Sequence, residues 1–175
     1  MPGTVVGPLT EELANEVGFQ CQVVLPATHD TGSAVLAVPS NEDPTLYISS
    51  GTWSLMGTER READCSEESR KRNFTNEGGY EYRFRYLKNI MGLWMIQSVK
   101  KELAAQGVEY SFAKLCEEAS AERIESLVDC NDARFLAPQS MIAEVKAYCS
   151  VHGQEVPETP AQIAAVIYNS LAFCY

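Results

Sequence analysis

The feature that most constrains the fold of this chain is a change in the spacing of its apolar residues near Leu87. Between residues 22 and 86, short apolar runs alternate with turn residues, a pattern typical of β-strands. After Leu87 the apolar residues recur with the spacing of one face of an α-helix. We therefore expect an α/β protein in which several strands come first and several helices follow.

Short apolar runs bounded by turn residues mark the expected strands. They lie at 23–25, 34–38, 45–49 and 53–56. A further extended stretch covers 74–86, where aromatic residues alternate with charged ones from Tyr80 onward, as in a half-buried strand. The intervening segment 59–72 is highly charged, and we expect it to be an exposed connection.

Cap residues and helical stripes mark the expected helices. They cover 10–17, the region from Leu87 to Gly107, 111–120, 138–151 and 159–175. Thr159 and Pro160 form a typical helix start, an N-cap followed by proline. The last helix is apolar up to its final residue, so we expect that the chain has been cut short there. An exposed apolar face on that helix would support self-association.

Charge and cysteine content argue against several classes of function. The net charge of −10 disfavours nucleic acid or an anionic membrane as the main partner. The six cysteines are scattered, without the close pairs that zinc sites need, so we expect free thiols and a cytoplasmic protein without a zinc site. No apolar run reaches the roughly 20 residues that span a bilayer. A small anionic ligand stays compatible, because backbone amides bind phosphate even within an acidic protein.

Asp30 lies in a polar run, residues 28–33, between two of the predicted strands. On spacing alone the simpler interpretation is a tight turn, in which Asp30 accepts amide hydrogen bonds and Gly32 takes positive φ. The functional alternative is a carboxylate at a strand end that acts as a general base towards a substrate hydroxyl.

Other polar positions also allow a structural and a functional interpretation. Residues 49–52 form either a plain β-turn or a turn whose amides and Thr52 hydroxyl bind phosphate oxygens. Residues 76–79 form a hairpin turn by default and a ligand loop only by context. Asn89 could be only the N-cap of the long helix, and Gln97 only a solvated helix residue.

Four motifs in order make a known family recognisable. They are His-Asp-Thr-Gly-Ser-Ala-Val at 29–35, Ser-Ser-Gly-Thr-Trp-Ser-Leu-Met-Gly at 49–57, Thr-Asn-Glu-Gly-Gly at 75–79 and Leu-Lys-Asn-Ile-Met-Gly-Leu-Trp at 87–94. Together they closely resemble the FGGY carbohydrate kinases, and among these the rhamnulokinases. The similarity extends through Asn-Asp-Ala-Arg-Phe at 131–135 and covers nearly the whole chain. One such motif alone is weak, whereas four at compatible spacing are specific.

For the fold, the resemblance implies a partial actin-like ATPase domain of the ribonuclease-H-like type. Such a domain begins with three antiparallel strands of a mixed sheet, and helices follow. Residues 1–18 would be an interdomain connection with a short helix, and 19–175 the first part of the family's C-terminal domain. The N-terminal domain of the same protein would then be the main protein partner.

For the chemistry, the resemblance implies transfer of the ATP γ-phosphate to the O1 hydroxyl of L-rhamnulose, with Mg²⁺, in L-rhamnose breakdown. Asp30 would be the base that activates the sugar hydroxyl. The same motifs place sugar contacts at His29, Asp30, Thr31 and Asn89, and ATP contacts at Thr52 and Gln97. The metal would be held mainly through the nucleotide and the N-terminal domain, with no metal ligand in this chain.

Asn89 and Gln97 would lie about two helical turns apart, on a shared side of one helix. Two alternative functions stay open: a kinase for another deoxyketose such as L-fuculose, and a non-catalytic actin-like module that binds nucleotide or sugar. Because part of the ATP site would lie outside these 175 residues, we expect the isolated chain to have no useful kinase activity.

Overall fold

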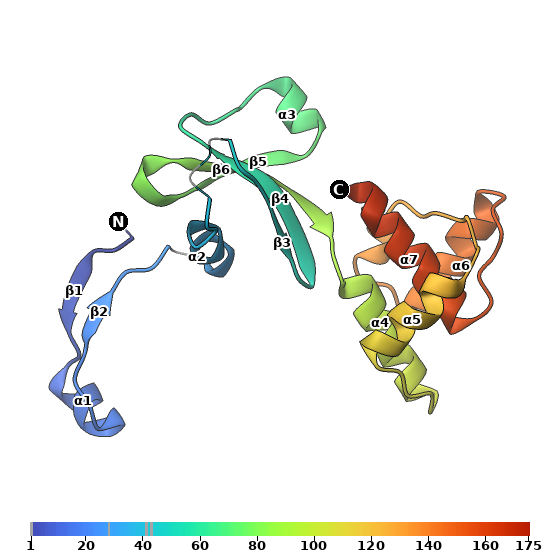
Figure 1. The fold of residues 1–175 in the computed structure, drawn as a ribbon, viewed down its shortest axis with the longest axis horizontal. Coiled ribbons are helices and arrows are strands. Elements are labelled where there is room, and N and C mark those ends of the chain that lie inside the picture. The colour runs from blue at the N-terminus through green and yellow to red at the C-terminus, as the bar shows by residue number, and fades with distance from the viewer. Residues whose placement is uncertain (1, 28, 41, 43) are drawn as a thin grey trace. The chain divides into compact units, whose positions relative to one another are not determined.

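The computed structural model describes residues 2–27, 29–40, 42 and 44–175. The chain forms two compact units (Figure 1). The first unit consists of Met1–Ser49 and Met56–Lys88, and the second of Ser50–Leu55 and Asn89–Tyr175. Strands dominate the first unit and helices the second, as the change in apolar spacing predicts.

The first unit begins with a two-stranded antiparallel ribbon, β1 (Val5–Pro8) and β2 (Gln22–Val24), whose strands are joined through helix α1 (Glu11–Val17). The Thr10 side chain accepts a hydrogen bond from the Leu13 amide and caps α1, and Gly18 ends the helix with a left-handed φ of 79°. The predicted helix at 10–17 is confirmed. None of the seven residues of α1 is buried, so caps rather than a core define it.

A four-stranded sheet follows, in the order β3 (Leu46–Ser50), β4 (Trp53–Arg60), β6 (Phe84–Met91) and β5 (Phe74–Gly78). Two residues connect β3 to β4, which makes this pair an antiparallel hairpin. Strands β5 and β6 are antiparallel as well, with Glu77 opposite Arg85. The sheet therefore has four strands where the resemblance implied a start of three.

Residues 34–38, which we expected to form a strand, contain the last turn of helix α2 (Asp30–Leu36) and its C-cap Ala37. The buried positions of α2, Gly32 and Val35, are three residues apart and lie on one helical face. The strand prediction was wrong because an unbroken apolar run carries no period that separates a strand from a short helix.

Two predictions about charged segments also need correction. The segment 59–72, expected to be an exposed connection, contains the end of β4 and helix α3 (Glu67–Lys71), with Ser69 buried. The extended stretch that we predicted from Tyr80 is broken by a 3-10 turn, η1 (Tyr80–Tyr82), with positive φ at Glu81 and Tyr82. This turn connects β5 to β6, since a hairpin needs local backbone reversal that a strand cannot supply.

The long helix begins later than predicted, as α4 (Trp94–Ala105). Residues up to Met91 continue strand β6, so Asn89 lies on a strand and not at a helix start. The predicted helical alignment of Asn89 with Gln97 is therefore wrong. Pairing with the neighbouring strands holds this segment extended, and that interaction comes from residues distant in the sequence.

The second unit is a helical core formed by α4, α5 (Phe112–Ala121), α6 (Met141–Val151) and α7 (Pro160–Cys174), with the short 3-10 turn η2 (Ala133–Phe135). Side-chain hydrogen bonds cap the last three α-helices at Ser111, Ser140 and Thr159. The predicted helices at 111–120, 138–151 and 159–175 are confirmed to within three residues at each end.

The apolar face of α7 lies inside this core, in contrast to the exposed face that we expected. Its largest buried side chains are Ile163, Val166, Ile167 and Leu171, each at most 5% exposed. They pack against the other helices of the unit. The apolar pattern of α7 is thus explained by packing within the chain and gives no support to self-association.

Candidate functional site

Asp30 is the first residue of α2, and His29 is the N-cap of this helix. The Asp30 side chain is 93% exposed, so its carboxylate is open to a substrate. The Thr31 amide donates a hydrogen bond of 2.7 Å to Oδ1 of Asp30, and His29 Nε2 lies 3.3 Å from the same oxygen. The carboxylate accepts a local amide bond, as the structural interpretation predicts. The tight turn itself was predicted wrongly, because Asp30 begins a helix and Gly32 does not take positive φ. The functional interpretation stays compatible with this geometry.

Two hydrogen bonds connect Ser33, in the first turn of α2, to the segment that precedes the helix. Its amide donates to the His29 carbonyl at 2.9 Å, and its hydroxyl donates to the Ala27 carbonyl at 3.0 Å. Local backbone geometry thus brings His29, Asp30 and Thr31 together, as the sequence predicts. Thr28, within the same predicted polar run, lies outside the described residues.

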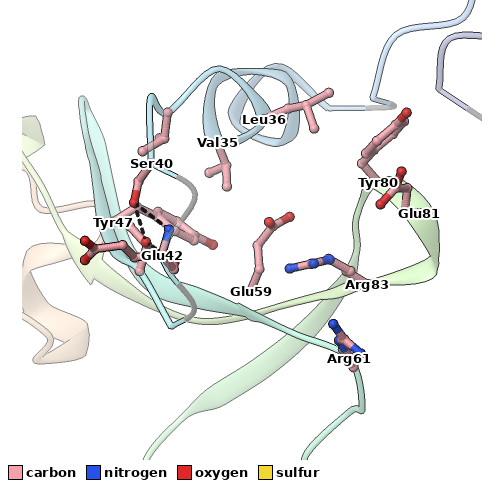
Figure 2. Close-up of a pocket in the computed structure, with 12 residues that line it drawn as sticks. Val35, Leu36, Ser40, Glu42, Tyr47, Glu59, Arg61, Tyr80, Glu81 and Arg83 are labelled. Atoms are coloured by element: carbon pink, nitrogen blue, oxygen red, sulfur yellow. Dashed lines mark hydrogen bonds between the residues drawn. The ribbon is translucent and has the colours of Figure 1, made fainter.

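A pocket of about 430 Å³ lies beside α2 in the first unit (Figure 2). Its wall includes Val35 from α2, Tyr47 from β3 and Glu59 from β4. Glu59 points between Val35 and Arg83 in this view. The predicted sugar contacts do not line the pocket, so it is a feature separate from the Asp30 carboxylate.

Arg85, on β6, is a residue of this region that the sequence alone did not single out. Its side chain is only 4% exposed, and its Nη2 lies 2.8 Å from Oε2 of Glu77. The alternation of aromatic and charged residues did indicate a half-buried strand. It did not indicate which face of the strand is buried. In the structure, Arg85 and Leu87 are buried, and Tyr86 is only half-buried.

In the second unit, the structure brings the two predicted ATP contacts together. The Thr52 hydroxyl donates to Oε1 of Gln97 at 3.4 Å, a long hydrogen bond between the β3–β4 turn and α4. The turn itself is held against the start of α4, since the amides of Leu93 and Trp94 donate to the carbonyls of Gly51 and Thr52 at 2.9 and 3.0 Å. Residues 45 positions apart are thereby fixed side by side.

This connection determines which groups can face a phosphate. Helix N-termini often bind phosphate through their free amides. Here the amides of Leu93 and Trp94 already donate to the turn, so they are not available. The Thr52 hydroxyl and the Gln97 side chain lie beside each other at this place.

Asn89 is exposed on β6, two residues before the strand ends. The Met91 amide donates to Oδ1 of Asn131 at 3.1 Å, and Trp94 Nε1 donates to the Phe135 carbonyl at 3.2 Å. Residues 131–135 therefore anchor the end of β6 and the start of α4. This explains in physical terms why that motif accompanies the one around Asn89.

Residues 76–78 are paired strand residues of β5, and only Gly79 lies in the connection to β6, so the hairpin turn comes later than the default interpretation placed it. Oδ1 of Asn76 accepts from the Asp64 amide, and its Nδ2 donates to the Asp64 carbonyl, both at 2.9 Å. The Asn76 side chain is thus used to hold the segment before α3 and is not presented to a ligand.

Three further properties bear on function. Among the described residues, no helix is long and apolar enough to cross a membrane. Within the same part of the chain, no group of three or more histidine, cysteine, aspartate or glutamate side chains could hold a metal ion. All six cysteines are free thiols.

Comparison with known proteins decides the family. The model of the C-terminal domain of the FGGY family of carbohydrate kinases matches residues 46–175. The chain belongs to the FGGY family of carbohydrate kinases. The matched region of this FGGY domain includes β3 to α7, and thus Thr52, Asn89 and Gln97.

Curated relatives extend the similarity beyond residues 46–175 to the segment that contains Asp30. A rhamnulokinase from Oceanobacillus iheyensis is 51% identical over 174 residues, which is 99% of this chain and 36% of the relative. A rhamnulokinase from Bacillus subtilis is 43% identical over 176 residues, 99% of this chain and 36% of the relative. One from Klebsiella pneumoniae is 44% identical over 174 residues, 99% of this chain and 34% of the relative. The FGGY chain described here thus spans about a third of the length of these relatives.

Proposed function

We propose that the full-length protein is a rhamnulokinase, which transfers the γ-phosphate of ATP to the O1 hydroxyl of L-rhamnulose in L-rhamnose breakdown. The observation that carries the proposal is the exposed Asp30 carboxylate, flanked by His29 and Thr31, in a chain of the FGGY family. The names of the relatives supply the sugar, since they are rhamnulokinases at up to 51% identity.

Asp30 accepts the proton of the sugar hydroxyl as that oxygen attacks the γ-phosphorus. Its side chain is free to do so, because the local amide bond from Thr31 uses one oxygen and leaves the group exposed. His29 and Thr31 contact the sugar beside the base, and Asn89 adds a further sugar contact. Phosphoryl transfer requires mainly alignment and charge stabilisation, and an oriented carboxylate supplies part of the alignment.

Thr52 and Gln97 contact the nucleotide, and the bond between them presents both groups as one surface. The domain is of the actin-like ATPase type, and the N-terminal domain of the same protein supplies the rest of the site. Closure of two domains would exclude water, which competes with the sugar as phosphate acceptor. The cytoplasm is the proposed compartment, in keeping with six free thiols.

Magnesium usually accompanies ATP in this chemistry, bound to the phosphates through one or two carboxylates and water. The described residues include no cluster that fits a resident metal ion. No step of the proposed mechanism is therefore assigned to a metal held by this chain.

The test uses the full-length protein with Asp30→Asn. We expect sugar-dependent ATP turnover to fall by about 10² to 10⁴-fold, the usual contribution of a general base, while nucleotide affinity is largely spared. Coupled assays of ADP release and calorimetric nucleotide titration measure the two effects. Glu16→Gln, on the exposed surface of α1, is the matched carboxylate-to-amide control and should behave as the unaltered protein. Turnover that survives Asp30→Asn would disprove the role of the base.

A substrate panel on the unaltered full-length protein tests the sugar. L-rhamnulose should give the highest kcat/KM, because the relatives are rhamnulokinases. Faster turnover of L-fuculose would replace the proposed substrate by that deoxyketose. Nucleotide binding without turnover of any sugar would identify a non-catalytic module instead.

A further inference from the structure

Arg85 is a buried charge directly beneath the helix that carries Asp30. Its side chain is 4% exposed on β6, and a buried charge is costly unless it is paired. Its partner is Glu77, which the β5–β6 register places directly opposite and whose Oε2 lies 2.8 Å from Nη2. The cross-strand pair offsets part of the cost of desolvation.

The pair does not satisfy the whole guanidinium. Nε and Nη1 of Arg85 are buried and have no hydrogen-bond partner among the described residues, and the same holds for Oε2 of Glu77. The contact between Arg85 and Glu77 is therefore an ion pair without hydrogen-bond geometry. A hydrophobic side chain of similar volume at this position would avoid that cost. Such replacements of buried charges often leave the free energy of unfolding unchanged or raise it. Stability therefore does not explain the arginine, and its contact with α2 suggests another reason.

That contact is with Gly32, in the first turn of α2 and two residues after Asp30. A Cβ atom added at Gly32 would lie 3.0 Å from Cζ of Arg85 and 3.1 Å from Nη1 and Nη2. The backbone of the turn thus lies close against the guanidinium, and the absence of a side chain at Gly32 permits this separation without displacing Arg85. The position of the guanidinium therefore sets the position of the first turn of α2. The position of the Asp30 carboxylate depends on that turn.

We propose that Arg85 is a positioning residue for the catalytic base, acting as a rigid platform under Gly32 that Glu77 holds in place. The proposal rests on the proposed kinase function for its catalytic consequence. It does not require Arg85 to touch sugar or nucleotide. A planar, permanently charged group suits this role better than lysine, whose ammonium is compact and lies on a flexible stem.

The test compares Arg85→Met and Arg85→Lys in the full-length protein. We expect Arg85→Met to lower kcat by about 100-fold, the usual result of displacing a catalytic group by about 1 Å, and to change the KM for ATP less than about threefold. Arg85→Lys keeps the positive charge but removes the planar guanidinium, and it should lower kcat by about 10-fold. Amide hydrogen exchange of residues 31–35 should become at least about tenfold faster in Arg85→Met, because the turn loses its support.

Arg60→Met is the matched control. Arg60 is the last residue of β4, where it forms an ion pair with Asp64 and lies over the Tyr86 ring. Its replacement removes an arginine from the same sheet and should leave kcat and the exchange of residues 31–35 unchanged. If Arg85→Met does not fold, Arg85→Lys still decides the question. Wild-type kcat together with wild-type exchange in the Arg85 variant that folds overturns the proposal.

The exchange measurement separates this inference from the proposed function. Faster exchange of residues 31–35 in a protein that turns over no sugar would uphold the platform and reject the kinase. Loss of kcat in Arg85→Met with unchanged exchange would overturn the platform even if the kinase activity is real.

Discussion

Two aspartates of the first unit have contrasting environments, one exposed and one held by neighbouring groups. Asp30 is 93% exposed and accepts one local amide bond. Asp64 accepts from the Ser66 amide at 3.1 Å and forms an ion pair of 3.0 Å with Arg60. Hydrogen bonds from Ser66, followed by that from Arg60, hold the pKa of Asp64 far below its ordinary value of 3.8. Asp64 therefore has a structural role, and its charge contributes to the stability of the fold.

The low pKa of Asp64 predicts how its contribution to stability depends on pH. A carboxyl group whose pKa is lower in the folded state stabilises that state above its unfolded pKa, and the contribution is lost as pH falls through the folded value. Asp64→Asn should thus lower the free energy of unfolding most at pH 7, and the difference should shrink steadily as pH falls below about 4. Urea denaturation of both proteins from pH 7 to pH 2.5 measures this, and a pH-independent difference would contradict it.

At the scale of elements, the β3–β4 turn and α4 depend on a close approach at Gly92. A Cβ atom at this position would lie 2.6 Å from the Gly51 carbonyl oxygen and 2.8 Å from the Thr52 carbonyl oxygen. Both atoms belong to backbone, which cannot move aside as a flexible side chain can. The absence of a side chain at Gly92 is therefore what lets the amides of α4 reach the turn and lets Thr52 meet Gln97.

Gly92→Ala should displace the turn from α4. We expect a loss of about 1–3 kcal/mol in the free energy of unfolding, as for other overpacked sites. In the full-length protein the KM for ATP should rise by about tenfold or more, since a displacement near 1 Å misaligns bound groups. Gly78→Ala is the matched control, because open space surrounds that position. Equal effects of the two substitutions on the KM for ATP would refute the explanation.

At the scale of the whole molecule, the two units differ in how they are stabilised. The second unit has a continuous helical core that includes Met95, Phe135 and Ile167, all fully buried. The first unit places most of its buried positions in the sheet, whereas its ribbon and α1 are exposed. The proposed base belongs to the first unit and the proposed nucleotide contacts to the second.

The isolated 175-residue chain should have no useful kinase activity. It spans 36% of the length of the rhamnulokinases from Oceanobacillus iheyensis and Bacillus subtilis, so most of the length of such an enzyme is outside it. Purified chain and full-length protein can be compared in one coupled assay with L-rhamnulose. An enzyme-like rate from the isolated chain would show this prediction to be wrong.

Local patterns determined much of the architecture. The cap residue Thr159 predicted a helix start correctly, because a cap acts on amides within the same turn. The segment 34–38 was assigned to a strand wrongly, since an apolar run fits either a strand or a short helix. Asn89 was assigned to a helix wrongly, because strand pairing with distant residues decides its conformation.

For the site, the sequence by itself determined the motif with His29, Asp30 and Thr31, because neighbours along the chain are neighbours in space. The ordered motifs also indicated the FGGY family, which the match over residues 46–175 confirms. Only the tertiary structure decided that Thr52 meets Gln97 across 45 positions and that Arg85 lies under Gly32. Both contacts depend on strand register and close backbone approach, and these are properties of the folded chain that no local pattern encodes.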